Sequence, residues 1–398
     1  MSRKVAVVLF NLGGPDSQEA IAPFLMNFFT DPNIIRVPMP FRWLIAKLIS
    51  RRRSRREAGD SYGLLGNVSP LLANSRVQAE ALEENLNTSP RRRPGSSDST
   101  EKDSGFRRND DASVYKTFVC MRYWHPMADE IAAQVKAWGA EEIVLLPLYP
   151  QFSTTTTWSS LGVWRRAVRK VGLNTPSSMI CCYPFEGGFI QASAENILVA
   201  YRQALQDGHK APRILFSAHG LPESVVKGGD PYQWQCEQTA EKIAAQLAVI
   251  LSEAKDPGIE APDPSALRPQ DDSKKLDWRI CYQSRVGPMK WIGPSTEEEL
   301  ERAARDNTAV IIYPHAFTQE HVETLVELDI EYRHKAEAMG LPGYYRAATA
   351  GTHPAFIDGL ATLVRDHQGR RDVAAEGGAC LCPAQYNRCC MRDFKTLD

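Results

Sequence analysis

Short apolar runs alternate with amphipathic segments along most of this chain, and this alternation restricts the fold more than any other feature. Amphipathic segments such as 128–139 and 236–251 place apolar residues every three or four positions, as a helix with one buried face does. Such βα repetition predicts parallel sheets flanked by helices. The runs that we expect to be strands are 5–11, 113–120, 141–149, 178–183, 211–219, 277–284 and 308–314.

The length of the chain predicts two domains rather than one, because it has 398 residues. We expect the division near residue 185, which gives two similar doubly wound, Rossmann-like α/β domains with the active-site cleft between them. The domains are then residues 1–185 and 186–370, followed by a cysteine-rich tail at 371–398.

Two polar segments interrupt this pattern, at residues 87–113 and 252–275. Both are rich in proline, serine and charge, and they contain too few apolar residues to offset the entropy of ordering them. We therefore interpret both as flexible surface insertions.

Charge and cysteine content narrow the partners and the location. The 47 Lys and Arg residues nearly balance the 48 Asp and Glu residues, and a net charge of -1 gives no general attraction for nucleic acid. Nine cysteines in a chain of this length do not make a disulfide scaffold and indicate a reducing, cytoplasmic compartment. No apolar run reaches the roughly 18 to 20 residues of a membrane span, so any membrane contact is expected to be peripheral.

His219 ends an apolar run and is followed by Gly220. An imidazole at the end of a buried parallel strand lies where open α/β sheets place their reacting groups. Taken alone, a histidine at a strand end is more readily explained by packing.

A second element, residues 316–332, is expected to be an unusually acidic helix. Its glutamates are spaced by three, four and four positions, which predicts four carboxylates on one helix face. Such a row can carry protons or a divalent cation, whereas the alternative is a solvated acidic face. The side chains concerned are Glu320, Glu323, Glu327 and Glu331, with His321 beside them.

Six blocks of the sequence, in order, resemble the ferrochelatases, which insert ferrous iron into a porphyrin to make haem. The resemblance covers essentially the whole chain apart from the two polar segments, and six ordered blocks are far more specific than a single motif. The blocks are residues 11–17, 121–126, 148–160, 215–232, 282–294 and 316–332.

The resemblance implies that His219 and Glu323 are the catalytic residues and line the metal site. His219 either accepts a pyrrole proton or hands over iron; we favour proton acceptance, with Glu323 helping to position the metal or to remove protons. The remaining side chains implied for a proton or metal conduit are Glu320, His321, Glu327 and Glu331.

The resemblance also implies a porphyrin pocket and an apolar lip. Arg122 is expected to attract a propionate of the porphyrin, and residues 24–56 resemble the lip by which relatives contact a membrane, here the inner membrane. A solvated helix end is the alternative for the basic run at 51–56, and Trp291 has the alternative of an ordinary core tryptophan. The other expected pocket residues are Leu12, Tyr123 and Phe317.

The C-terminal cysteines suggest a cofactor. Some ferrochelatases hold a [2Fe–2S] cluster with one internal and three C-terminal cysteines, and the matching set here is Cys182, Cys382, Cys389 and Cys390. A tail of free thiols is the alternative.

Three questions of function stay open at this point. The porphyrin is protoporphyrin IX or coproporphyrin, and the metal is iron or, in the nearest enzymatic alternative, cobalt. A porphyrin or haem carrier without catalysis is the alternative from another class of protein.

Overall fold

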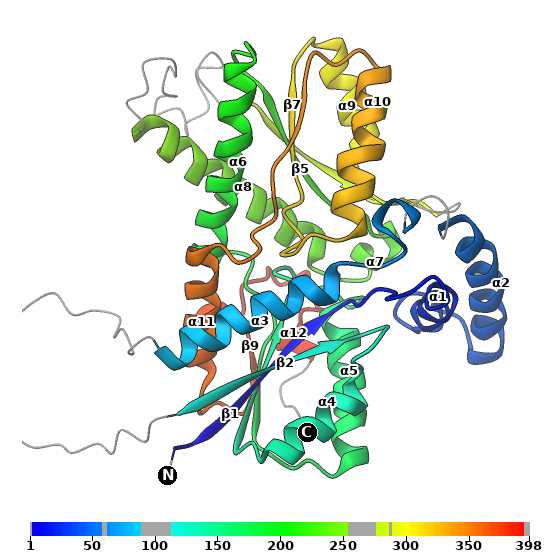
Figure 1. The fold of residues 1–398 in the computed structure, drawn as a ribbon, viewed down its shortest axis with the longest axis vertical. Coiled ribbons are helices and arrows are strands. Elements are labelled where there is room, and N and C mark those ends of the chain that lie inside the picture. Colours follow the sequence, from blue (N-terminus) through cyan, green and yellow to red (C-terminus); the bar gives the residue numbers. More distant parts are fainter. Residues whose placement is uncertain (1, 58–61, 89–112, 254–275, 286–288, 394–398) are drawn as a thin grey trace, which may run out of the picture.

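Two parallel β-sheets form the scaffold of the protein (Figure 1). The structure is a computed structural model, and it describes residues 2–57, 62–88, 113–253, 276–285 and 289–393. The first sheet has the strand order β2-β1-β3-β4-β9 and the second has the order β6-β5-β7-β8. All strand pairings in both sheets are parallel, so the expected α/β fold is confirmed.

All the strands expected from the sequence are present, and two more occur. The additional strands have three and two residues, which is too short for a recognisable periodicity. One of them, β9, adds a segment of the expected tail to the edge of the first sheet. The strands are β1 (Lys4–Asn11), β2 (Val114–Met121), β3 (Glu142–Pro147), β4 (Ser177–Ile180), β5 (Arg213–His219), β6 (Trp278–Gln283), β7 (Val310–Tyr313), β8 (Tyr344–Arg346) and β9 (Val373–Ala374).

Helices cover both faces of each sheet. On the first sheet, the helices α3 and α11 pack on one face, and α4 and α5 pack on the other. On the second sheet, α6 and α8 cover one face, and α9 and α10 cover the other. These helices are α3 (Leu71–Thr88), α4 (Ala128–Trp138), α5 (Thr157–Val171), α6 (Gly187–Gln206), α8 (Tyr232–Glu253), α9 (Thr296–Arg305), α10 (Tyr332–Ala338) and α11 (Pro354–His367).

The remaining helical elements are short or lie outside these layers. Helices α1 and α2 pack on each other and project from one side of the molecule (Figure 1). The elements are α1 (Ile21–Phe29), α2 (Met39–Glu57), the 3-10 turns η1 (Gly63–Leu65) and η4 (Glu376–Gly378), α7 (Glu223–Lys227), the π-helix η3 (Glu323–Glu331) and α12 (Cys390–Asp393).

Burial on both faces explains why the central strands are continuous apolar runs. Every residue of β1 except Lys4 is buried, as expected for a parallel strand between two helical layers. A single core joins the two sheets, because Leu9 of the first sheet, Phe356 of α11 and Phe216 of the second sheet belong to one cluster of buried side chains. The two expected insertions lie almost wholly outside the described residues.

Candidate active site

His219 is the last residue of β5. It lies at the end of the second sheet that the C-terminal ends of the parallel strands form. Strand β5 lies between β6 and β7. The chain continues from β5 to β6 on one side and from β7 to β8 on the other, and open α/β sheets bind ligands where the strand order reverses in this way. Gly220 follows, and its N–H donates to the carbonyl of Gln283 over 2.9 Å. A Cβ atom at position 220 would lie 2.9 Å from that same carbonyl oxygen, so only glycine lets the chain turn this closely.

The segment after β7 brings a carboxylate to this histidine. The Glu323 Oε2 atom lies 3.0 Å from His219 Nδ1 and 3.9 Å from His321 Nε2. Glu323 begins the π-helix η3, which continues directly into α10. The single α-helix that the sequence predicted over 316–332 is therefore wrong in its type, although the predicted approach of His219 and Glu323, 104 positions apart, is present.

Glu327 lies one turn further along η3 and is fixed by Ser284. The Ser284 N–H and hydroxyl both donate to the Glu327 carboxylate, over 2.9 and 2.5 Å. Ser284 has a φ of 60°, an unusual conformation for a residue other than glycine and one that is often found at functional sites. The sequence analysis missed Ser284, although its position just after β6, the neighbour of β5, was a usable signal.

Electrostatic interactions adjust the protonation of the central pair. Burial lowers the pKa of His219, but the Glu323 charge, its hydrogen bond and the Glu327 charge together raise that pKa above the usual 6.5. Burial raises the pKa of Glu323, yet His219, His321 and Arg53 of α2 hold it at about 2. Glu323 is therefore a permanent carboxylate beside an imidazole that readily takes up a proton.

The neighbouring groups have different protonation behaviour. Burial and the Glu323 charge raise the pKa of Glu327 to about 7, although Ser284 and His219 oppose the shift. Burial lowers the pKa of His321, which therefore stays neutral. Glu327 can consequently exchange protons near neutral pH, whereas Glu323 cannot.

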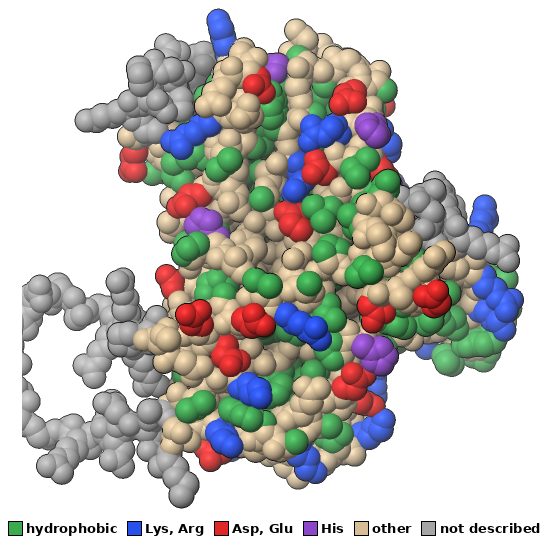
Figure 2. All heavy atoms as spheres, in the orientation of Figure 1, with side chains coloured by type: hydrophobic (Ala, Val, Ile, Leu, Met, Phe, Trp, Pro, Cys, Tyr) green, Lys and Arg blue, Asp and Glu red, His purple; other side chains and the backbone are tan. Residues whose placement is uncertain are grey.

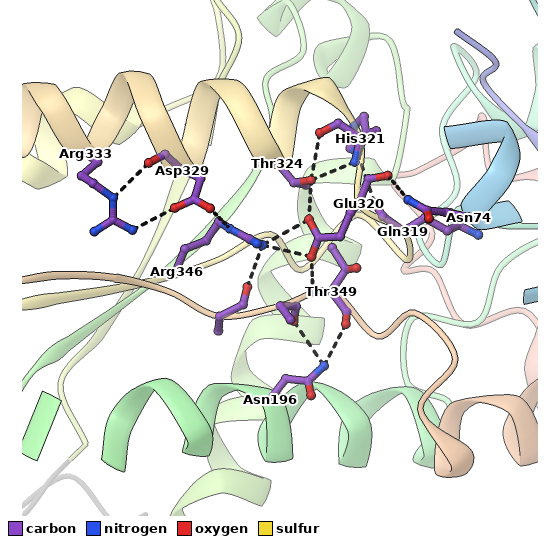
Figure 3. Close-up of polar contacts among 12 residues, drawn as sticks. Asn74, Asn196, Gln319, Glu320, His321, Thr324, Asp329, Arg333, Arg346 and Thr349 are labelled. Carbon is purple, nitrogen blue, oxygen red and sulfur yellow. Dashed lines mark hydrogen bonds and ion pairs between the residues drawn. The ribbon is translucent and has the colours of Figure 1, made fainter. Parts of the chain in front are cut away.

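Glu320 does not share the face of Glu323 and Glu327, so the expected row of four carboxylates is wrong at this position. Its carboxylate receives hydrogen bonds from Arg346 and from the Thr324 hydroxyl (Figure 3). The physical reason is that Glu320 precedes the helix, where an i, i+3 rule does not apply. Glu331, in contrast, is exposed at the end of η3.

The expected pocket residues lie in two groups, one after strands of the second sheet and one after strands of the first sheet. The Phe317 ring lies 4.6 Å from the His321 ring, centre to centre. The Trp291 ring would contact a Cβ at position 220, so it lies next to the turn after His219. Leu12 packs on an apolar cluster that includes Phe24 of α1.

Arg122 and Tyr123 are occupied by a buried acid that the sequence analysis missed. The Asp31 Oδ2 atom accepts hydrogen bonds of 2.7 Å from both Arg122 Nη2 and the Tyr123 hydroxyl, and a further one from Ser159. Arg122 is thus not a free cation for a propionate, and Tyr123, which is 1% exposed, lies beneath the pocket surface. The acidic partner of Arg122 and Tyr123 is far away in the sequence, so no local sequence pattern predicts this contact.

Six of the nine cysteines gather where the C-terminal segment crosses the end of β4. The Cys181 and Cys390 sulfurs lie against each other, so Cys390 faces Cys181 and not the other thiols of the group. Gln235 Nε2 donates to the Cys182 and Cys382 sulfurs over 3.5 and 3.2 Å. The Cys380 and Cys389 sulfurs are 3.7 Å apart.

The four free thiols of this group are of the ligand type that a metal–sulfur site requires. Burial and the charge of a neighbouring Cys389 thiolate raise the pKa of Cys182. Neighbouring thiols of this group therefore do not readily lose their protons together. Two sulfurs on one tetrahedral metal, with bonds of about 2.3 Å, are separated by about 3.8 Å. The free set is Cys182, Cys380, Cys382 and Cys389.

Two further observations concern the described residues alone. No group of three or more His, Cys, Asp or Glu side chains within them is arranged to hold a single metal ion. A cavity of about 690 Å³ lies beside Trp291, between α7 and α9, and charged side chains such as Arg285 and Glu298 line it. His219, Glu323 and Glu327 are not part of that lining, but Trp291 lies next to both the cavity and the turn after His219.

Comparison with known proteins identifies the family. A family model described as Ferrochelatase matches residues 4–368. A ferrochelatase of Hyphomonas neptunium is 44% identical over 99% of this chain and 97% of the relative. A ferrochelatase of Caulobacter vibrioides is 44% identical over 99% of both chains, and one of Wolbachia from Drosophila simulans is 44% identical over 90% of this chain and 98% of the relative.

Two parallel sheets with a histidine and a carboxylate at the edge of the second one define an α/β fold of the chelatase kind. The matches are more specific than the fold. The chain belongs to the ferrochelatase family, the lyases that insert iron into porphyrin in haem biosynthesis. Membership of this family favours iron insertion over the alternatives of a porphyrin carrier or a cobalt chelatase.

Proposed function

We propose that the chain inserts ferrous iron into protoporphyrin IX and that His219 accepts the pyrrole protons. A divalent iron replaces two N–H protons of the macrocycle, so the reaction releases two protons and needs a base near the ring centre. The observation that carries this proposal is the 3.0 Å contact between His219 Nδ1 and Glu323 Oε2.

That contact selects the tautomer of His219. Because Glu323 stays ionised, the Nδ1 atom of His219 carries a proton and donates a hydrogen bond to the carboxylate. The Nε2 atom then keeps its lone pair and is the proton acceptor, as in other histidines oriented by a carboxylate. A protonated imidazole is stabilised by the same carboxylate.

Glu327 supports a route for the proton away from His219. Its pKa of about 7 lets it take up and release a proton at neutral pH. Glu331 follows at the exposed end of the same helix, where solvent is available. We therefore assign proton transfer to Glu327 and Glu331, with Glu323 as the fixed charge that orients His219.

Iron, as the substrate, can also bind at His219. The Nε2 atom of His219 has a single lone pair, so it can bind iron or accept a proton, but not both at the same moment. Glu323 Oε2 contacts the other ring nitrogen, Nδ1, and thereby orients Nε2 for either role. Phe317, Trp291 and Leu12 supply apolar surface for the macrocycle around these groups.

The experiment that tests this proposal is an anaerobic assay with ferrous iron and either protoporphyrin IX or coproporphyrin. Loss of porphyrin fluorescence reports metal insertion with each substrate. We expect kcat/KM to be at least about tenfold higher with protoporphyrin, because two vinyl groups are more apolar than two propionates next to an apolar lip. A preference for coproporphyrin would contradict this choice of substrate.

We also propose that α1 and α2 contact the surface of the inner membrane. Helix α2 presents exposed apolar side chains together with several basic ones, and Figure 2 shows both kinds on the projecting part of the molecule. This combination suits binding to an anionic lipid surface. The exposed apolar side chains are Met39, Phe41, Trp43, Leu44, Ile45 and Leu48. No helix in the described ranges has the length and apolar content for a membrane crossing.

Sedimentation with vesicles tests the lip. Replacing Phe41, Trp43 and Leu48 together by serine should lower binding to vesicles of anionic phospholipid by about tenfold or more, since each loses apolar burial in the interface. Val199→Ser is the matched control, because Val199 is 70% exposed but lies on α6. Equal binding by the triple variant and the wild-type chain would contradict the proposal.

We propose further that the four free thiols hold a [2Fe–2S] cluster. Cys182 supplies the internal ligand, and Cys380, Cys382 and Cys389 supply the C-terminal ones; Cys380 takes the place first assigned to Cys390. A two-iron cluster spreads its ligands over a larger space than one ion does. When bound, the cluster would cross-link the segment after β4 to the C-terminal segment.

Cysteine substitutions distinguish these ligands. Anaerobically purified protein should contain about two irons and two sulfides per chain, with visible absorption from the cluster. Cys182→Ser and Cys380→Ser should lose both, whereas Cys390→Ser and Cys281→Ser should keep them. Loss in Cys390→Ser with retention in Cys380→Ser would restore the first assignment, and absence of sulfide from the wild-type chain would remove the cluster.

A further inference from the structure

Glu320 is the centre of a polar network just before the catalytic π-helix. Its two carboxylate oxygens lie 3.0 and 3.1 Å from Arg346 Nη1. The Thr324 hydroxyl donates to it over 2.6 Å and the Thr349 N–H over 2.9 Å. Figure 3 shows these groups converging on one carboxylate from the helix that follows it and from the segment 346–349. A carboxylate with this many partners is held in one position.

Arg346, on β8, also contacts a second carboxylate inside the π-helix. Its Nε atom lies 3.1 Å from Asp329 Oδ2, and the other oxygen of Asp329 accepts from Arg333 Nη2 over 2.8 Å (Figure 3). Arg346 thus joins Glu320, before η3, to Asp329, near its end. Only a planar guanidinium with several N–H groups can hold two acids in this way.

The segment before η3 is also fixed from the first half of the chain. Asn74 of α3 donates to the Glu320 carbonyl over 2.8 Å. The Gln319 carboxamide oxygen accepts from Asn11, at the end of β1, over 3.1 Å. Tertiary contacts from both sheets therefore determine where this segment lies.

A π-helix needs such support because its i, i+5 hydrogen bonds are less favourable than those of an α-helix. A local return to the α form would rotate Glu323 and Glu327 about the helix axis by different amounts. Glu323 would then leave His219, or Glu327 would leave Ser284. The register of η3 is thus a condition for the geometry of the site.

We infer that Arg346 is a positioning residue for metal insertion, which fixes Glu320 and Asp329 and thereby keeps η3 in the register that brings Glu323 to His219. This inference rests on the proposed roles of His219 and Glu323. Arg346 contacts neither of them, and its side chain is 13% exposed. Its effect on turnover is therefore expected through the position of η3 and not through direct contact with substrate.

Substitution of Arg346 by methionine tests the inference. We expect kcat for iron insertion to fall by about tenfold to a hundredfold, since a displacement near 1 Å at a reacting group has an effect of that size. The KM for porphyrin should change by less than about twofold to threefold, because the pocket residues are untouched. Hydrogen exchange should accelerate at the backbone amides of residues 321–331.

Three further variants make the result specific. Arg346→Lys should give intermediate turnover, because one ammonium group cannot reach both acids. Glu320→Gln, which keeps the size of the side chain, should also lower kcat and remains informative if Arg346→Met does not fold. Arg370→Met is the matched control, since Arg370 pairs with Asp372 and with neither Glu320 nor Asp329, and it should keep kcat within about twofold.

The outcomes separate the inference from the proposed function. Unchanged kcat and unchanged exchange at 321–331 in Arg346→Met and Glu320→Gln would overturn the inference. A lowered melting temperature with kcat unchanged would also overturn it, because the role would then be stability alone. If His219→Ala kept full activity, the proposed function would fail, while the exchange measurement would still decide whether Arg346 holds η3.

Discussion

Replacing His219 by alanine is expected to lower the turnover number for iron insertion by about 10³-fold or more, in the upper part of the range for loss of a general base. This corresponds to about 4 kcal/mol of lost transition-state stabilisation. The Nε2 lone pair of His219 is the proton acceptor in this account. The neighbouring imidazole of His321 is a weaker base, because burial lowers its pKa.

Porphyrin binding should be nearly unchanged in the same variant. Quenching of porphyrin fluorescence measures the dissociation constant without metal, and a change below about threefold is expected because the apolar surface remains. His125→Ala is the matched control, since this imidazole is exposed and pairs with Glu130 instead. Turnover within about threefold of wild type in His219→Ala would exclude His219 as the base.

Replacing Glu323 by glutamine is expected to lower kcat by about 10²-fold with little change in KM. Glutamine keeps the size of the side chain and still accepts a hydrogen bond from His219 Nδ1, but it removes the charge. Because the Glu323 charge raises the pKa of His219, that pKa should fall in the variant. The reaction needs neutral His219, so the acidic limb of the rate profile should move to lower pH.

A matched control and a steady-state pH series check this result. Glu337→Gln removes an exposed carboxylate on α10 and should leave both kcat and the profile unchanged. An unchanged turnover number in Glu323→Gln would remove this carboxylate from the mechanism. A lower kcat with an acidic limb displaced to higher pH would contradict the assigned electrostatic role.

Much of the fold was predictable because parallel strands between helices are continuous apolar runs. Strands such as β1 and β5 carry that signal in seven or eight residues. Strand β9 carries none in two residues, and its place is decided by pairing with β4. The path of the C-terminal segment back to the first sheet is therefore a tertiary result that local patterns do not contain.

The candidate site was predictable where function requires a particular residue at a strand end. His219 was found in this way, whereas Glu323 was found from the glutamates of residues 316–332 and the family resemblance; the structure brings the two together. The prediction failed for Glu320 because the spacing assumes that residue 320 already lies in the helix, whereas η3 begins at Glu323. The partner of Arg122 was missed for a related reason, since Asp31 is 91 positions away in the sequence.

The most direct test of His219 as the base is the pH dependence of a single turnover, with iron insertion followed anaerobically by loss of porphyrin fluorescence. Since the pKa of His219 lies above the usual 6.5, the wild-type rate should rise with pH, with its midpoint above 6.5. The His219→Ala variant should show a rate lower by about 10³-fold without that rise. A wild-type rate that does not change between about pH 5.5 and 8.5, or a variant that retains the same rise, would contradict proton acceptance by His219.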